Sequence, residues 1–287
     1  MRITGTTVTC GIVGDPVAHS LSPVMHNAAF EHESLDHVYV AWRVPRGTAA
    51  SCAEAMRALG IRGLNVTVPH KVDIIAHLDE VDAQAARIGA VNTVVNTAGR
   101  LHGYNTDAQG FLHGLWSRGI DTRGMNVMVL GAGGAARAAV FALVGAGARV
   151  TVLNRNVERA ASLARDVTAA TGAHIAHDAL TGDVLASQLR EVGLLVNTTS
   201  VGMHPLQEET PCPVELLRRE LAVCDIVYNP RETALLRAAA ALGAVTVDGV
   251  EMLVRQGAMA FELWTGIDAP VGVMRAAVLG ELGREKK

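Results

Sequence analysis

VMVLGAGGAA (residues 127–136) is the stretch of sequence that decides the fold. Four apolar residues, typical of a buried strand, run directly into a Gly-x-Gly-x-x-Ala pattern, and an alanine-rich helix is expected to follow. Gly131 permits a tight turn, and Gly133 lets the backbone approach a pyrophosphate that the free N–H groups of the helix then meet. The pattern predicts a Rossmann-type domain that binds a dinucleotide at this turn. A glycine-rich turn without a ligand is the alternative.

The next predicted strand, residues 150–153, indicates which dinucleotide binds. It ends at Asn154-Arg155, where an NAD site would usually place a carboxylate for the ribose hydroxyls, and Arg159 follows one helical turn later. Guanidinium groups bind phosphate in charge-assisted pairs, whereas a carboxylate would repel the 2′-phosphate. The sequence therefore favours NADP over NAD, with a solvated basic helix start as the alternative interpretation.

The composition is that of a globular protein with two α/β domains. The chain has 287 residues, of which 49% are hydrophobic and 18% are charged, so disorder is not expected. The net charge of −3 and the aromatic content of 3% favour neither nucleic acid nor an anionic membrane as a partner. The four cysteines have no paired spacing and the histidines lack further ligands at metal spacing, so we expect reduced thiols and no metal. The pattern shows neither a signal peptide nor a membrane span, which makes the cytoplasm the expected compartment.

Polar clusters follow the short strands that alternate with helices in the first hundred residues. They are GDPVAHSLSP (14–23), NVTVPHK (65–71), GAVNT (89–93) and GYNTD (103–107). Because ligands of open α/β sheets bind at the carboxyl ends of strands, these clusters predict a second binding site. Ser20 and Ser22 have the spacing to converge on one carboxylate, although Ser22 would also serve as the N-cap of the helix that follows. Asn65 and Thr67 alternate along a strand end and so face the same side.

A domain boundary is expected near residues 107–124, where a helix runs into a polar stretch. After it, a second series of strands begins, and strands that alternate with helices imply parallel βαβ units. The tail over residues 250–282 is helical by pattern. Its periodicity is compatible both with extending the second domain and with folding back onto the first.

Eight blocks of the sequence together resemble the shikimate dehydrogenase family. They run in order from about residue 8 to about residue 270, and several are specific to that family rather than to dinucleotide-binding proteins at large. The blocks are GDPVAHSLSPVMHN (14–27), NVTVPHK (65–71), GAVNT (89–93), GYNTDAQGF (103–111), GAGGAARA (131–138), NTTSVGM (197–203), VYNPRETALL (227–236) and DGVEMLVRQGAMAFELWTG (248–266).

The resemblance implies a role for each matching residue. Lys71 would be catalytic with Asp107 as its partner, and the two serines of the SxS turn would hold the substrate carboxylate. Gln256 would reach the substrate from the C-terminal helices, which implies that the tail folds back onto the first domain. The remaining implied ligands are Asn65, Thr67, Asn92 and Tyr228 for the substrate, and Gly131, Ala132, Gly133, Gly134, Ala135, Asn154, Arg155, Arg159, Met203 and Gly249 for the cofactor. The sequence departs from the family at Asn156, where NADP-using relatives often carry Ser or Thr, so the preference for NADP is expected to be weaker.

The implied reaction is the reversible reduction of 3-dehydroshikimate to shikimate by NADPH in the biosynthesis of chorismate and the aromatic amino acids. Hydride delivery builds negative charge on the ketone oxygen, which an ammonium group at Lys71 would protonate or stabilise. The implied domains are residues 1–107 with 250–287 for a mixed-sheet substrate domain and 108–249 for the NADP domain, in a monomer or a homodimer.

Two alternatives stay open. The first is a dehydrogenase for quinate or an amino analogue of shikimate with relaxed use of NAD and NADP. The second is a catalytically silent NADPH-binding sensor, which should have lost the Lys–Asp pair that this sequence keeps.

Overall fold

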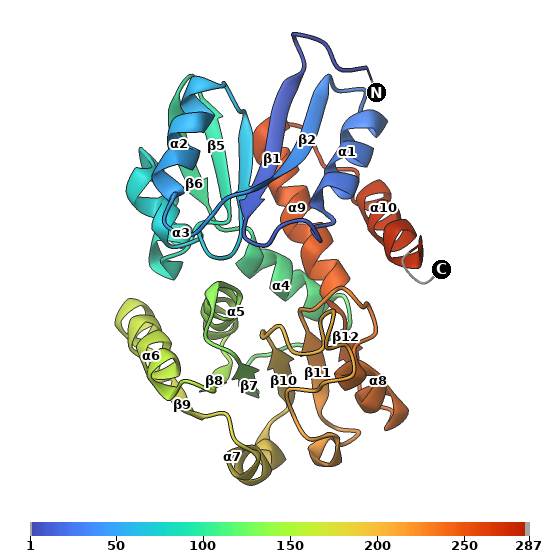
Figure 1. The fold of residues 1–287 in the computed structure, drawn as a ribbon. Helices are drawn as coiled ribbons and strands as arrows, with labels where there is room; N and C mark the ends of the chain where they lie inside the picture. The colour runs from blue at the N-terminus through green and yellow to red at the C-terminus, as the bar shows by residue number, and fades with distance from the viewer. Residues whose placement is uncertain (1, 285–287) are drawn as a thin grey trace. The chain divides into compact units, whose positions relative to one another are not determined.

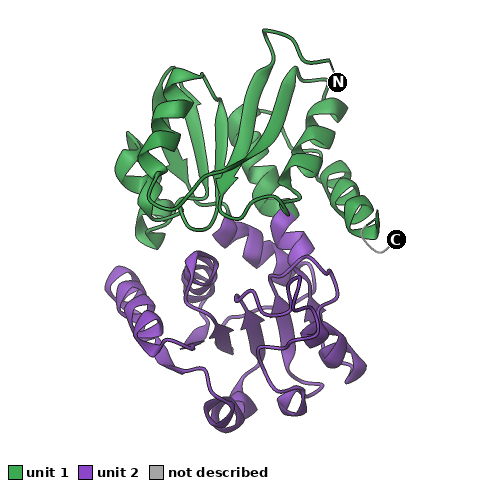
Figure 2. Cartoon of the chain, viewed as in Figure 1, with its two compact units in different colours: residues 1–106, 254–287 green, residues 107–253 purple. Residues whose placement is uncertain are grey.

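The computed structural model describes residues 2–284, and the chain divides into two compact units. Unit 1 is Met1–Thr106 with Val254–Lys287, and unit 2 is Asp107–Leu253. Figure 2 shows the two units in different colours. The first unit is therefore built from both ends of the chain, and the second from one continuous stretch.

Unit 1 contains a six-stranded mixed sheet in the order β2-β1-β3-β5-β6-β4 (Figure 1). β1 pairs in parallel with both β2 and β3, whereas β5 runs antiparallel to its neighbours β3 and β6. Buried residues dominate the central strands β1, β3 and β5, whereas β2, β4 and β6 are only partly buried. The strands are β1 (Val8–Gly14), β2 (His37–Arg43), β3 (Gly63–Val66), β4 (Glu80–Val81), β5 (Thr93–Thr97) and β6 (Arg100–Tyr104), and the helices before the tail are α1 (Ser22–His32), α2 (Ala49–Ala58) and α3 (Ala83–Ile88).

The C-terminal tail belongs to unit 1, as the resemblance implied. It forms the end of α9 (Gly249–Thr265) and α10 (Val271–Arg284), and α10 packs beside α1. The indole of Trp264 donates a hydrogen bond of 3.1 Å to the carbonyl oxygen of Val94 in the sheet. Beneath that indole lies Gly63, where a Cβ atom would come within 2.4 Å of the ring. The sheet thus has a glycine at the position where the tail lies against it.

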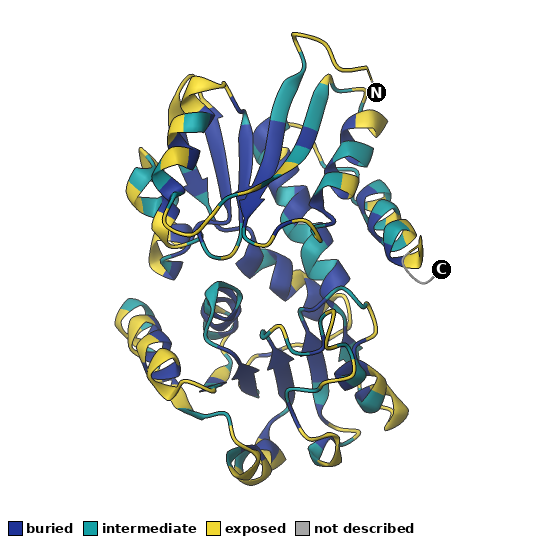
Figure 3. Cartoon of the chain, viewed as in Figure 1, coloured by how far each residue is buried: buried dark blue, intermediate teal, exposed yellow. Residues whose placement is uncertain are grey.

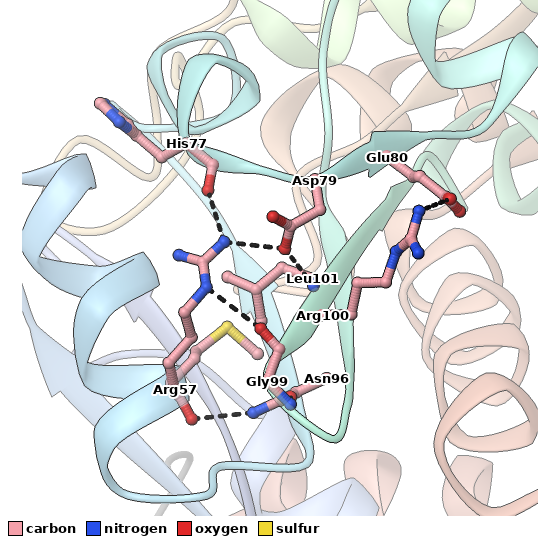
Figure 4. Close-up of polar contacts among 9 residues, drawn as sticks. Arg57, His77, Asp79, Glu80, Asn96, Gly99, Arg100 and Leu101 are labelled. Atoms are coloured by element: carbon pink, nitrogen blue, oxygen red, sulfur yellow. Dashed lines mark hydrogen bonds and ion pairs between the residues drawn. The ribbon is translucent and has the colours of Figure 1, made fainter.

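An arginine-centred cluster joins α2 to the β5–β6 hairpin (Figure 4). The guanidinium of Arg57 donates to the carbonyl oxygen of Gly99 at 3.1 Å and to the carboxylate of Asp79 at 2.8 Å. Asp79 also accepts from the backbone N–H of Leu101 at 2.7 Å. The backbone hydrogen bond and the guanidinium together lower the pKa of Asp79. The cluster thus connects α2 to the β5–β6 hairpin through the side chains of Arg57 and Asp79.

Unit 2 contains a six-stranded parallel sheet in the order β12-β11-β10-β7-β8-β9. With its strands numbered along the chain from β7 and read from the β9 side, this is the order 3-2-1-4-5-6 of the doubly wound dinucleotide fold. Ligands of that fold bind where the order reverses. That point lies between β7 and β10. The strands are β7 (Asn126–Leu130), β8 (Arg149–Asn154), β9 (Ala176–Ala179), β10 (Leu194–Asn197), β11 (Ala222–Asp225) and β12 (Thr246–Val247), and the helices are α4 (Asp107–Trp116), α5 (Gly134–Gly145), α6 (Val157–Thr171), α7 (Gly182–Gln188) and α8 (Ala234–Ala241).

Burial follows the layers of each unit, with the central strands buried and the outer helix faces exposed (Figure 3). In α6, for example, the buried Ala160, Leu163 and Val167 are spaced three or four residues apart and so lie on one face. The short edge strand β9 was not predicted, because its residues are partly exposed and carry no apolar run. Among the described residues, no helix is long and apolar enough to cross a membrane.

Candidate active site

The strand directions of unit 1 bring its polar clusters to one edge of the sheet. β1 and β3 are parallel, and β5 and β6 then run antiparallel in succession. The carboxyl ends of β1, β3 and β6 and the amino end of β5 therefore share an edge. The side chains at that edge come from the predicted clusters beside each of these strand ends, and they include Asn65, Thr67, Asn92 and Thr106.

Asn65 lies near the end of β3 and is only 4% exposed. Its side chain makes three hydrogen bonds within the protein. Its amide nitrogen donates to the carbonyl oxygen of Asn92 at 3.2 Å and to the hydroxyl of Thr93 at 3.1 Å. Its amide oxygen accepts from the hydroxyl of Tyr39 at 2.6 Å. The side chain is thus fixed in one orientation by the surrounding protein.

Asn92 links the first half of the sequence to the tail. Its amide nitrogen donates to the hydroxyl of Thr106 at 2.9 Å and to the amide oxygen of Gln256 at 3.4 Å, and its amide oxygen accepts from the backbone N–H of Thr106 at 2.8 Å. Asn65, Asn92 and Gln256, all expected to bind substrate, therefore lie in one hydrogen-bonded group. Sequence reasoning missed three members of this group, Tyr39, Thr93 and Thr106; the two threonines stand next to selected residues in the GAVNT and GYNTD blocks.

Lys71 follows a short turn after β3 that is fixed by backbone hydrogen bonds. The N–H of His70 donates to the carbonyl oxygen of Thr67 at 2.9 Å, and the carbonyl oxygen of Lys71 accepts from the N–H of Val91 at 2.8 Å. The imidazole of His70 is buried against the carbonyl oxygen of Val44 at 2.8 Å. The half-buried Lys71 is therefore anchored beside the residue that precedes Asn92.

Lys71 also stands out by composition. Residues 1–285 contain this single lysine, and every other basic residue in that range, histidine apart, is an arginine. The other non-histidine basic side chains of this range carry guanidinium groups, whereas residue 71 carries an amine. Because a guanidinium cannot lose its proton in proteins whereas an amine can, this choice favours proton chemistry at residue 71.

The serine turn differs in one respect from the sequence prediction. The N-cap of α1 is Leu21 without a side-chain cap, and Ser22 is the first helical residue. Capping by Ser22 is thus wrong, because the helix begins one residue early and its first turn includes Pro23. The N–H of Ser22 instead donates to the hydroxyl oxygen of Ser20 at 3.3 Å. The two serines stay close together, and neither caps the helix.

The dinucleotide motif of unit 2 has the geometry that its glycines predicted. β7 ends at Leu130, and Gly131 has a φ of +110°, which L side chains rarely adopt. A Cβ atom there would lie 2.6 Å from the hydroxyl oxygen of Thr198. The N-cap of α5 is Gly133, where a Cβ atom would meet nothing, so the helix start is open to a ligand.

The end of β8 fits a 2′-phosphate. Arg155 and Arg159 are both exposed, and Asn154 ends the strand. Asn156 is the N-cap of α6, and its amide oxygen accepts from the N–H of Arg159. The NH2 group of Asn156 is the part that stays available to a phosphate oxygen. Two guanidinium groups and an amide fit NADP, as the sequence predicted.

Asp225, at the end of β11, is a buried carboxylate that the sequence analysis did not identify. The carboxylate accepts from the amide of Asn197 at 2.9 Å, the N–H of Val227 at 3.1 Å and the hydroxyl of Thr233 at 2.8 Å. Burial raises the pKa of Asp225 to about 6, against these three hydrogen bonds. Asn197 in turn accepts from the hydroxyl of Thr199 at 2.7 Å. The carboxylate thereby holds the loops that lead to the predicted ligands Met203 and Tyr228.

Two further predicted residues lie at helix starts. Asp107 is the first residue of α4 and is 5% exposed. Gly249 is the first residue of α9, and a Cβ atom there would lie 2.3 Å from the carbonyl oxygen of Ile226. Lys71 and Asp107 belong to different units, and their pairing stays a prediction.

Comparison with known proteins covers almost the whole chain. Residues 12–94 match the model of the shikimate dehydrogenase substrate binding domain, residues 117–251 that of shikimate / quinate 5-dehydrogenase, and residues 249–279 that of the shikimate 5′-dehydrogenase C-terminal domain. The chain is 50% identical over 275 residues to the shikimate dehydrogenase (NADP(+)) of Symbiobacterium thermophilum, covering 95% of this chain and 94% of that one.

Solved structures are similar over the same length. A shikimate dehydrogenase in complex with NADP+ is 39% identical, with a TM-score of 0.92 and 98% of each chain covered. The shikimate 5-dehydrogenase of Thermus thermophilus, in complex with NADP(H) and shikimate, is 43% identical, with a TM-score of 0.84 and coverage of 95% of this chain and 99% of that one.

Proposed function

The chain belongs to the shikimate dehydrogenase family, and from this premise we propose that it interconverts shikimate and 3-dehydroshikimate with NADP, in the biosynthesis of aromatic amino acids. It is an oxidoreductase that acts on a secondary alcohol with NADP as the acceptor. The observation that carries the proposal is the hydrogen-bonded amide group of Asn65, Asn92 and Gln256 at one sheet edge. Amides held in this way are suited to a small molecule with several hydroxyls, because such sites reject analogues that leave an amide without its partner.

Lys71 and Asp107 are the proposed catalytic residues. NADPH supplies the hydride when it is bound, and the protein must then manage the charge that develops on the substrate oxygen. The Lys71 ammonium would donate a proton to that oxygen or stabilise it as a fixed cation. Asp107 would keep the amine protonated and orient it, because an opposite charge nearby favours the charged forms of both groups.

The remaining polar residues would bind and orient the two ligands. The hydroxyls of Ser20 and Ser22 would hold the substrate carboxylate, and Asn65, Thr67, Asn92 and Gln256 would contact the ring hydroxyls, with Tyr228 near the ring. In unit 2 the start of α5 would meet the pyrophosphate, and Met203 and Gly249 would line the nicotinamide end. The 2′-phosphate would be bound by Asn154, Arg155 and Arg159.

Domains, assembly and compartment complete the proposal. Unit 1 is the proposed substrate domain and unit 2 the proposed NADP domain, with residues 1–107 and 250–287 against 108–249 as the expected division. We propose a monomer or homodimer in the cytoplasm, without nucleic-acid or membrane partners; sedimentation of the purified protein decides the assembly.

One assay tests the function. Purified protein is offered shikimate and quinate, each with NADP and with NAD, and nicotinamide absorbance is followed. The expected result is the fastest reduction with shikimate and NADP. Faster reduction of NAD with quinate would support the quinate alternative. The family model that matches residues 117–251 includes both shikimate and quinate dehydrogenases by its description. Binding of NADPH without turnover of any alcohol would indicate the silent sensor.

Replacement of the catalytic lysine tests the mechanism. Lys71→Met should lower kcat by about 10²-fold or more, since proton transfer by a positioned group contributes ~10²–10⁴-fold. Lys71→Arg keeps the charge but not the proton chemistry, so its activity distinguishes an acid–base role from a purely electrostatic one. Lys286→Met, in the C-terminal segment, is the matched control and should keep wild-type kcat.

A further inference from the structure

Tyr39 lies in the edge strand β2, and a side chain of α1 binds both its backbone N–H and its backbone carbonyl group. Its backbone N–H donates to the amide oxygen of Asn27 at 2.8 Å, and the amide nitrogen of Asn27 donates back to the carbonyl oxygen of Tyr39 at 2.9 Å. β2 has only β1 as a neighbour, so Asn27 satisfies backbone groups that a further strand would otherwise bind. The ring stacks on His26 with centroids 4.5 Å apart and planes 10° apart. The phenol is therefore fixed in position and direction.

The hydroxyl of Tyr39 acts on one residue of the proposed substrate site. It donates to the amide oxygen of Asn65 at 2.6 Å. Tyr39 is 1% exposed, and burial raises the pKa of its phenol well above the usual range. The group is thus a neutral hydroxyl that always has a proton to donate.

The hydrogen bonds of Asn65 determine which way its amide faces. The carbonyl oxygen of Asn92 can only accept, so the NH2 group of Asn65 must lie toward it. The amide oxygen then lies toward Tyr39, and the phenol must be the donor. Both amide hydrogens are engaged, by Asn92 and Thr93, and one lone pair of the oxygen is taken by Tyr39. What Asn65 offers a ligand in this arrangement is the second lone pair of its oxygen.

We propose that Tyr39 is a positioning residue of the substrate site, which holds the Asn65 amide oxygen toward a substrate hydroxyl. The proposal rests on the proposed function. It assigns no contact between Tyr39 and substrate: the phenol acts through Asn65. A tyrosine that only fills the core would instead affect stability, with no selective effect on substrate binding.

Removal of the phenol hydroxyl tests this role. In Tyr39→Phe the amide oxygen of Asn65 loses its donor, and the amide is free to turn or to recruit water. We expect KM for shikimate to rise about tenfold, equivalent to about 1.4 kcal/mol, with KM for NADP within about twofold of wild type. The matched control is Tyr104→Phe in the same sheet, whose hydroxyl contacts His102 at 3.0 Å, and it should leave both KM values unchanged.

A double-mutant cycle separates positioning from packing. In an Asn65→Ala background, Tyr39→Phe should raise KM for shikimate by less than about twofold, because the amide it positions is gone. The same rise in KM with and without Asn65, or an unchanged KM in Tyr39→Phe, would overturn the proposal. A wild-type enzyme that does not oxidise shikimate would overturn the proposed function and this inference together, whereas an active wild type with a neutral Tyr39→Phe overturns the inference alone.

Discussion

The buried carboxylate of Asp225 should make the protein less stable as pH rises. Burial raises its pKa to about 6 from the ordinary 3.8. Between those values the folded state binds a proton that the unfolded state has released, so the free energy of unfolding falls with rising pH and levels off above about 6. Each pH unit of difference between the two pKa values is equivalent to about 1.4 kcal/mol. The gap of about two units is equivalent to about 3 kcal/mol in all, of which about 2.4 kcal/mol is lost between pH 4 and 7.

Asp225→Asn isolates this contribution, because a neutral amide does not titrate. Urea unfolding of wild type and variant is measured at pH 4, 5, 6, 7 and 8, and the difference in the free energy of unfolding is plotted against pH. All other titrating groups are common to both proteins, and Asp183→Asn, which removes an exposed carboxylate from the same unit, corrects for the change in net charge. The wild type should lose about 2.4 kcal/mol relative to Asp225→Asn from pH 4 to 7.

The opposite slope would refute this reasoning. Three donors approach the Asp225 carboxylate, and each favours its charged form. A wild type that gains stability relative to Asp225→Asn as pH rises would mean that these hydrogen bonds outweigh burial.

Four further perturbations follow from single residues. His26 is buried with no partner for either ring nitrogen, and burial lowers its pKa to about 3, so wild type should lose about 1.4 kcal/mol per pH unit as pH falls below ~6.5, and His26→Phe should lose less in acid urea titrations. Gly131→Ala places a side chain at φ +110° and against Thr198, which should cost about 1–3 kcal/mol in unfolding experiments and weaken NADP binding in calorimetric titrations. Asp82→Ala removes the N-cap of α3 and should cost about 1 kcal/mol, measured as a lower urea midpoint. Arg155→Ala should raise KM for NADP about tenfold and leave KM for NAD within about twofold, whereas equal effects on both would place Arg155 outside the 2′-phosphate site.

The cofactor unit shows how much of the fold and site can be predicted locally. The apolar run of β7, the glycine turn and the alanine-rich α5 are adjacent in sequence, and the structure places them within a residue or two of the predicted bounds. Turn chemistry and side-chain periodicity act over a few residues, so they can be recognised without knowing the fold. The polar clusters of the first half were recognised for the same reason, as short blocks after strands.

The tertiary structure decided what depends on distant residues. Periodicity left the tail unassigned, and only the fold brings Gln256 beside Asn92 and packs Trp264 over Gly63. Tyr39 bonds to a residue 26 positions later. Such contacts depend on the order of strands in the sheet, which is set by the burial of the whole unit. Sequence determined the chemistry of each block because that chemistry is local, whereas the partners of each side chain were decided by packing across the entire chain.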